Sequence, residues 1–151
     1  MKRALFFAIT LVLAFAPGCK EERTPLAPLL DVKINLSYEP PNITIDAPDP
    51  DPATIAKGDK INWVVTVVRG APLEVTIDDF ADSSGKRVDV FGDGSTYTFG
   101  GVGSSPVGRP SGPAGIVSGP DGFKYRITAV SSTGDRSVLD PRIIVSAGLS
   151  H

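Results

Sequence analysis

Apolar and polar residues alternate along several short stretches of this chain, and the clearest stretch lies in its first half. It follows a Gly58-Asp59 turn and places four apolar side chains on one side of the chain, namely Ile61, Trp63, Val65 and Val67. A period of two, β-branched residues and the only Trp of the chain together indicate a half-buried β-strand. We therefore expect this strand to lie in the core of the fold.

The same alternation predicts further short strands, each ended by a turn or by Pro. We expect strands at residues 31–38, 42–46, 73–80, 87–91, 95–99, 123–129 and 137–145, the last with a kink at Asp140-Pro141. Because Asp93-Gly94 readily takes positive φ angles, it predicts a tight hairpin between residues 87–91 and 95–99. About seven or eight short strands without an amphipathic helix predict an all-β fold, an antiparallel β-sandwich.

Two stretches break the alternation. Asp46 to Pro52 repeats Asp-Pro, and Pro fixes φ and lacks an amide hydrogen, so we expect a stiff exposed loop rather than part of a sheet. Gly100 to Gly115 is rich in Gly and Pro and has few apolar side chains, which predicts a long mobile loop. If the two loops lie at one end of the sandwich, they form a shared binding surface on a rigid scaffold.

The N terminus has the features of an export signal. Lys2 and Arg3 precede an apolar run, Ala4 to Ala16, which is shorter than the roughly 20 residues that a spanning helix needs. The run ends in Gly18-Cys19 and resembles a bacterial lipoprotein signal, although Ala16 stands where such signals usually have Leu. The alternative is a plain secretory signal that leaves Cys19 as a free thiol.

The lipoprotein resemblance implies a division of the chain. Residues 1–18 are removed, residues 19–30 form the lipidated Cys19 and a tether, and residues 31–148 form the β-sandwich domain. A lone Cys in an exported chain cannot form an internal disulfide, which favours lipidation of Cys19. Lys20 follows the Cys, and by the sorting rule of enteric bacteria this implies the outer membrane of the cell envelope.

The charge of the chain limits its partners. There are 15 Lys and Arg against 17 Asp and Glu, a formal net charge of −2, and the basic residues are not clustered. Nucleic-acid binding requires a concentrated basic face, so we expect no nucleic-acid partner. The expected partners are the membrane, through a lipid on Cys19, and an unknown envelope protein or ligand.

Two segments resemble the cupredoxin fold. Asn42 to Trp63 has a strand, an acidic Pro-containing loop and then Ala-Lys-Gly-Asp-Lys-Ile-Asn-Trp, which is similar to the first half of that fold. Phe123 to Val145 is similar to the paired C-terminal strands of copper-free versions on bacterial lipoproteins. The resemblance implies a cupredoxin-like Greek key, and an immunoglobulin-like sandwich shares the same alternation and turns.

The chemistry of the cupredoxins is not expected here. A blue copper site uses two His, a Cys and a weak axial Met. The only His is His151, the last residue, and the only Cys and Met are Cys19 and Met1. Residues 131–135, where a cupredoxin would carry ligands, contain Ser, Thr, Gly and Asp. We expect no copper and no other cofactor.

The sequence also gives little indication of a group of residues that could form a catalytic site. Nucleophilic catalysis needs a base beside the nucleophile, and His151 lies at the chain end. Asp78, Asp79 and Asp82 could supply paired carboxylates, but neighbouring residues on a strand point to opposite faces, so we expect a solvated strand end. We therefore expect no enzymatic activity.

A few residues remain as candidates for binding. Carboxylates of Asp46, Asp49 and Asp51, with Asp59, could gather around Ca²⁺, although the interleaved Pro residues oppose closure of that loop, so we expect no metal site.

Arg109 is the candidate anchor for a partner within residues 100–115, because Arg is favoured in binding hot spots. Asp46, Asp49 and Asp51 are candidates for the same role, whereas the turn alone explains Asp89 and Asp93. The sequence thus predicts a lipid-anchored, non-catalytic binding or structural module. The alternative is a metal-binding periplasmic protein, for calcium or related to copper, or an enzyme of unrecognised type.

Overall fold

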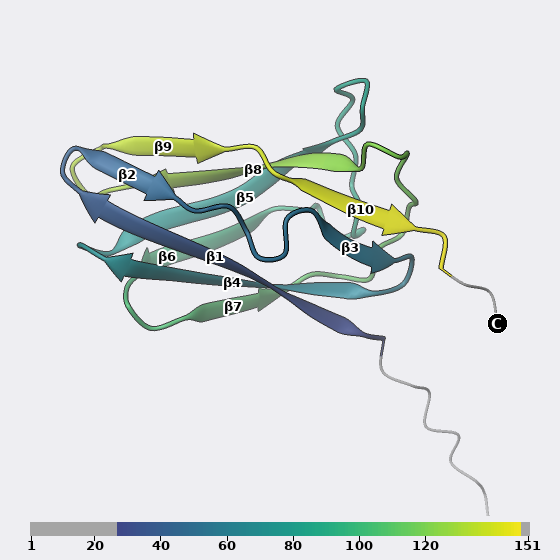
Figure 1. The fold of residues 1–151 in the computed structure, drawn as a ribbon, viewed down its shortest axis with the longest axis horizontal. Helices are drawn as coiled ribbons and strands as arrows, with labels where there is room; N and C mark the ends of the chain where they lie inside the picture. Colours follow the sequence, from purple (N-terminus) through teal and green to yellow (C-terminus); the bar gives the residue numbers. More distant parts are fainter. Residues whose placement is uncertain (1–26, 149–151) are drawn as a thin grey trace, which may run out of the picture.

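The computed structural model describes residues 27–148, which form an all-β fold with ten strands in two sheets (Figure 1). The expectations for the signal segment, Cys19 and His151 lie outside the described residues. The strands are β1 Leu29–Glu39, β2 Asn42–Ile45, β3 Ala53–Ala56, β4 Lys60–Arg69, β5 Leu73–Ala81, β6 Tyr97–Val102, β7 Val107–Pro110, β8 Phe123–Val130, β9 Arg136–Leu139 and β10 Arg142–Ser146. The part of the chain between residues 27 and 148 contains no helical segment that could span a bilayer.

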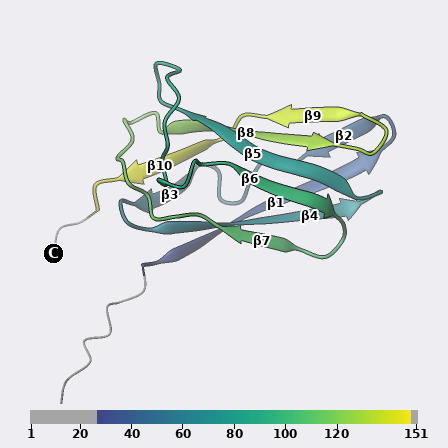
Figure 2. The same cartoon turned by 180° about the vertical axis from the view of Figure 1, so that it is seen from behind.

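The two sheets face each other across one hydrophobic core. Sheet A has the strand order β2-β1-β4-β7, and sheet B has the order β3-β10-β8-β5-β6 with β9 also paired to β8. Buried side chains from both sheets belong to a single cluster, an arrangement that fits a β-sandwich. Figure 2 shows the same two layers from behind, with β5 and β6 in front.

The strand with the only Trp lies in the core, as its alternation predicts. Ile61, Trp63, Val65 and Val67 of β4 are all at most 1% exposed, and the residues between them are less buried. Strand β8 follows the same rule, with Phe123, Tyr125, Ile127 and Ala129 buried. Period-two burial is set by the pleat of each strand, so the local pattern was enough to find these elements.

The pairing of the strands differs from the expected, purely antiparallel sandwich. β1 runs parallel to β4, with Val32 opposite Trp63, and β3 runs parallel to β10, with Ile55 opposite Val145. Parallel neighbours need a connection that crosses over rather than a hairpin. Here the chain leaves β1 through β2, passes to sheet B as β3 and returns to sheet A as β4.

Residues 46–52 form this crossover, and the expectation of a loop outside the sheets was wrong for part of it. The amide of Asp49 donates to the Lys33 carbonyl and the Lys33 amide donates to the Asp49 carbonyl, both at 2.9 Å. Asp49 therefore makes an antiparallel bridge to β1. The Pro residues on each side lack amide hydrogens, so the pairing is interrupted, and the Asp46 amide donates separately to the Asn35 carbonyl at 3.0 Å.

The expected hairpin at residues 87–99 is also wrong. Residues 87–91 form no strand, apart from a single bridge between Ala81 and Arg87, and β6 pairs with β5 instead. The Asp89 carboxylate accepts hydrogen bonds from the amides of Gly92 and Gly94. Within the expected strand, the Val88 amide donates to the Phe80 carbonyl and the Phe91 amide donates to the Ser95 hydroxyl group, so these donors are not free to pair with the backbone of residues 95–99.

The stretch from residue 100 to 115 is not the structureless loop that its composition predicts. It completes β6 and supplies β7, which pairs with β4 at the edge of sheet A. Beyond β7 the buried Ser111 hydroxyl accepts a hydrogen bond from the Ile61 amide at 2.9 Å. An edge strand held by its backbone needs few apolar side chains, which is why its sequence gives no alternating pattern.

The chain's only Trp lies at the centre of an aromatic cluster. The Trp63 ring centroid is 5.1 Å from that of Tyr125, 5.9 Å from Tyr97 and 6.2 Å from Phe80. Tilted rings at these distances add to the effect of burial. Both sheets supply rings to this cluster, so it joins the two layers.

We predict that Trp63→Ala lowers the free energy of unfolding by about 3–5 kcal/mol, because it leaves a cavity between the sheets. Urea denaturation followed by circular dichroism measures the change. Val68→Ala is the control, since Val68 is 58% exposed, and it should change stability by no more than about 0.5 kcal/mol. A Trp63→Ala variant as stable as Val68→Ala would contradict the central packing role.

Candidate functional site

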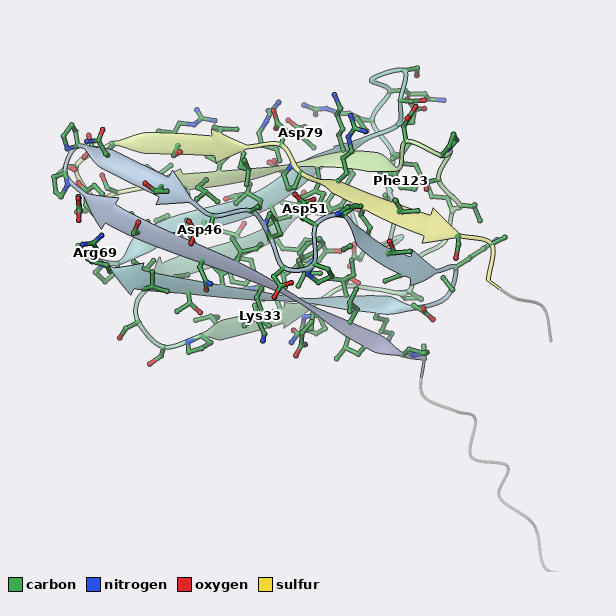
Figure 3. All side chains as sticks on the ribbon, viewed as in Figure 1. Lys33, Asp46, Asp51, Arg69, Asp79 and Phe123 are labelled. Atoms are coloured by element: carbon green, nitrogen blue, oxygen red, sulfur yellow. The ribbon has the colours of Figure 1, made fainter. Side chains whose placement is uncertain are left out.

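The residues expected to bind a partner do not come together in the structure. Arg109 lies on β7, whereas Asp46, Asp49 and Asp51 lie along the crossover beside β1 and β2. β2 and β7 are the opposite edges of sheet A, and Figure 3 shows Asp46 and Asp51 along the crossover. The shared surface expected from the two unusual stretches is therefore not formed.

Arg109 covers the open edge between the two sheets. It is paired with Trp63, so its side chain lies on the inner side of sheet A. Its guanidinium carbon is 5.8 Å from the ring centroid of Phe99, which is buried on β6. A cation over an aromatic face is stabilising, and an inward-pointing charge on an edge strand opposes pairing with another sheet.

The aspartates considered for calcium are likewise separate. Within residues 27–148, no group of three or more His, Cys, Asp or Glu side chains is placed to hold a metal ion. Asp59 instead accepts a hydrogen bond from the Ala56 amide through its carboxylate, at 2.9 Å. Asp59 thus holds the turn that leads into β4.

The structure gathers charged residues at another place, a bulge in β5. Ile77 and Phe80 both point into the core, so the two residues between them, Asp78 and Asp79, are both displaced to the outer side. The pairing with β8 shifts between Asp78 and Ala81, and Asp79 has φ of 55°. The expectation that these neighbours point to opposite faces was therefore wrong, because a bulge breaks the alternation.

Asp79 is held between two arginines on the outer face of sheet B. Its carboxylate oxygens lie 2.6 Å from an Arg87 nitrogen and 2.5 Å from an Arg126 nitrogen. Arg126 also reaches Asp140, with 3.4 Å between the charged atoms. Figure 3 labels Asp79 on this side of the molecule. Shared ion pairs of this kind fix the bulge and orient the guanidinium groups.

Asp78 is in a different environment from its neighbour. Its Oδ1 atom is buried and has no hydrogen-bond partner among the described residues. Burial raises the pKa of Asp78 above its usual value of 3.8, and the negative charge of Asp79 raises it further. Arg126 and Arg87 oppose this rise. The free energy needed to ionise the carboxyl group thus differs between Asp78 and its neighbour Asp79.

A pocket of about 300 Å³ opens beside the bulge. Its lining includes Asp78, Asp79, Arg87, Asp89 and Thr96. A guanidinium group and carboxyl groups in one hollow can hold a small polar or charged group by paired hydrogen bonds. We call this hollow the bulge pocket. One signal in the sequence could have indicated it, namely the spacing of Ile77 and Phe80, which departs from the period of two.

Asp82, Asp89 and Asp93 hold turns rather than forming a carboxylate pair. Hydrogen bonds from Ser84 and the Lys86 amide lower the pKa of Asp82. A hydrogen bond from the Ser95 hydroxyl, at 2.7 Å, lowers the pKa of Asp89. Asp93 accepts hydrogen bonds from the Tyr97 hydroxyl and the Gly112 amide. Asp89 and Asp93 thus hold the bend at residues 92–95, but the turn alone does not explain them, because Asp93 also binds Gly112 and Asp89 also lines the bulge pocket.

The turn at residues 131–135 ties the two sheets together. The Tyr38 hydroxyl of β1 donates to the Asp135 carboxylate at 2.6 Å, and this bond is the main cause of the lowered pKa of Asp135. Ser131 and Thr133 donate to the same carboxylate. The turn considered for copper ligands thus contains a hydrogen-bonded network of hydroxyl groups around one carboxylate.

We predict opposite effects for two neighbouring substitutions at the bulge. Because the pKa of Asp78 is raised in the folded state, its ionised form opposes folding at neutral pH. Asp78→Asn should therefore raise the free energy of unfolding at pH 7. This gain should shrink as the pH falls through the raised pKa of folded Asp78, and it should be lost below 3.8, where Asp78 is protonated in both the folded and the unfolded state.

Asp79→Asn is the matched control, since Asn also tolerates positive φ. It loses two ion pairs, and it should lower stability at pH 7 by about 1 kcal/mol. Urea unfolding from pH 3 to pH 8 measures both variants. Equal losses of stability in the two variants would contradict the claim that the carboxyl groups of Asp78 and Asp79 lie in different environments.

No protein-family model matches the chain, and no curated protein matches it as a relative.

Proposed function

We propose that this chain is a lipid-anchored protein of a bacterial cell envelope, held at the outer membrane, and that its all-β domain is a non-catalytic binding module. The fold that we propose in finer detail is a Greek key of the cupredoxin-like or immunoglobulin-like type. The passage of residues 46–52 from sheet A to sheet B, around one shared core, supports it.

The observation that carries the binding role is the bulge pocket. Asp78 and Asp79 line it from strand β5, and Asp79 is held by ion pairs with Arg87 and Arg126, which favours a preformed site. The carboxyl oxygen of Asp78 that has no partner adds a hydrogen-bonding group for a ligand. A partner with both an anionic and a hydrogen-bond-donating group matches this set.

The position of the N-terminal strand supports the anchor. The start of β1 and the end of β10 lie at the same end of the domain (Figure 1). A lipid on Cys19 attaches the domain from that end and leaves the outer face of sheet B accessible to a partner. Asp78 and Asp79 of β5 line the bulge pocket from the outer side of sheet B.

We predict that Cys19→Ala releases the protein from membranes, because it removes the site of the lipid. Fractionation of cells and radiolabelled palmitate incorporation measure this. Ala16→Leu restores the residue that is usual in lipoprotein signals, so this variant should stay in the membrane and keep the label. Membrane retention of a Cys19→Ala variant would contradict the anchor.

The binding role is tested by photocrosslinking in the native envelope. A photoreactive amino acid at Thr96, an exposed residue that lines the bulge pocket, should give a defined adduct. The same probe at Val68, exposed at the end of β4 in sheet A, is the control and should give none. Adduct formation at Thr96 should decrease with Arg87→Ala. Identical adducts at both positions, or none at Thr96, would contradict binding at the pocket.

A further inference from the structure

Three exposed apolar side chains gather at the end of the domain where β1 starts. Leu29 is 53% exposed, Ile116 is 37% exposed and Val117 is 46% exposed. Leu29 opens β1, and the other two residues lie between β7 and β8. Large exposed apolar residues that gather in one place mark a surface for a partner or a membrane.

Main-chain hydrogen bonds show that these segments are neighbours. The Lys60 amide donates to the Pro28 carbonyl at 3.0 Å, and the Gly58 amide donates to the Ala114 carbonyl at 2.9 Å. The Ser118 amide donates to the Val145 carbonyl, also at 2.9 Å. We call residues 28–29, 57–60 and 114–118 the base of the domain. Figures 1 and 2 both show the start of β1 and the end of β10 at this end.

The backbone of the base holds the apolar pair outward. Before the pair, the Ala114 amide donates to the Asp59 carbonyl and the Gly115 amide donates to the Val90 carbonyl. After the pair, Ser118 is bound to Val145 through both its amide and its hydroxyl group. Because the chain is held on both sides, Ile116 and Val117 cannot turn into the core without breaking these bonds. Their exposure is therefore a property of the fold.

The charges of the base suit an anionic surface. Lys57 and Lys60 are exposed there. Asp59 between them uses its carboxylate to accept the Ala56 amide and is half-buried. The nearby Asp121 lines a hollow with the cations Lys124 and Arg142 on the sheet B side. Apolar side chains beside lysines are the combination found in segments that lie in a membrane interface.

We propose that the base rests on the lipid bilayer, with Leu29, Ile116 and Val117 in the headgroup region and Lys57 and Lys60 at anionic lipid phosphates. This inference rests on the proposed lipid anchor at Cys19. The segment from Cys19 to Leu29 spans at most roughly 35 Å when fully extended. The anchor thus keeps the base close to the bilayer, so that a weak surface contact is enough to orient the domain.

A probe of polarity at the base tests the proposal. Cys19 carries the lipid in the mature chain, so Val117→Cys introduces a single free thiol that takes an NBD fluorophore. The labelled lipoprotein is reconstituted into vesicles of phosphatidylethanolamine and phosphatidylglycerol. We expect NBD emission at position 117 to shift to shorter wavelength and to be quenched by lipids with a nitroxide in the headgroup region.

Val68→Cys is the matched control, because Val68 is an exposed Val at the other end of sheet A. Its emission should remain that of a probe in water. Ile116→Cys repeats the measurement if Val117→Cys fails to fold, as judged by the fluorescence of buried Trp63. The combined change Lys57→Gln and Lys60→Gln should reduce the shift at position 117, and so should vesicles without phosphatidylglycerol.

The two proposals fail in different ways. If the mature chain carries the lipid by mass spectrometry and floats with the vesicles, but NBD at position 117 reports water, the base does not rest on the bilayer and the anchor stands. If mass spectrometry shows that the peptide beginning at Cys19 carries no lipid, the proposed anchor is wrong. The orientation proposed for the base is then also wrong, because it depends on the anchor.

Discussion

The packing of Trp63 between the two sheets is the interaction on which the other features of this domain depend. Strand β4 presents Trp63 to rings from β5, β6 and β8. Phe80 lies three residues after the inward-pointing Ile77, so in a regular strand its side chain would point outward, away from that cluster. The bulge turns Phe80 inward, and Phe80 stacks on Tyr125 with 5.4 Å between the ring centroids.

The charged outer site is a consequence of the same constraint. A bulge that turns Phe80 inward places Asp78 and Asp79 together on the outside. Two adjacent carboxyl groups repel each other, and Arg87 and Arg126 reduce that repulsion through Asp79. Asp78 keeps a buried oxygen without a partner. The bulge in β5 therefore sets both the packing of Phe80 in the core and the position of Asp78 and Asp79 at the bulge pocket. A substitution of Phe80 in the core would also alter the pocket.

The edges of the sheets are protected in different ways. At one edge of sheet A, Arg109 covers Phe99 and points a charge inward. At the other side, the crossover bonds to β1 through the backbone of Asp46 and Asp49, and Pro residues prevent a continuous ladder. Arg109 and Asp49, which the sequence suggested for partner binding, thus help to close the fold, whereas the bulge pocket and the base leave charged and apolar side chains open to solvent.

Local patterns in the chain were enough to predict the all-β class, the core strand with Trp63 and a bend at residues 92–94, although not the hairpin expected around that bend. Burial at a period of two and the hydrogen bonds of an Asp in a turn are local properties that a short stretch of chain specifies. The parallel pairing of β1 with β4, the presence of β7 and the shared face of Asp78 and Asp79 could not be predicted from the sequence. Each of these depends on contacts between residues far apart in the chain, and a Gly- and Pro-rich edge strand or a bulge leaves little trace in the alternation of its own residues.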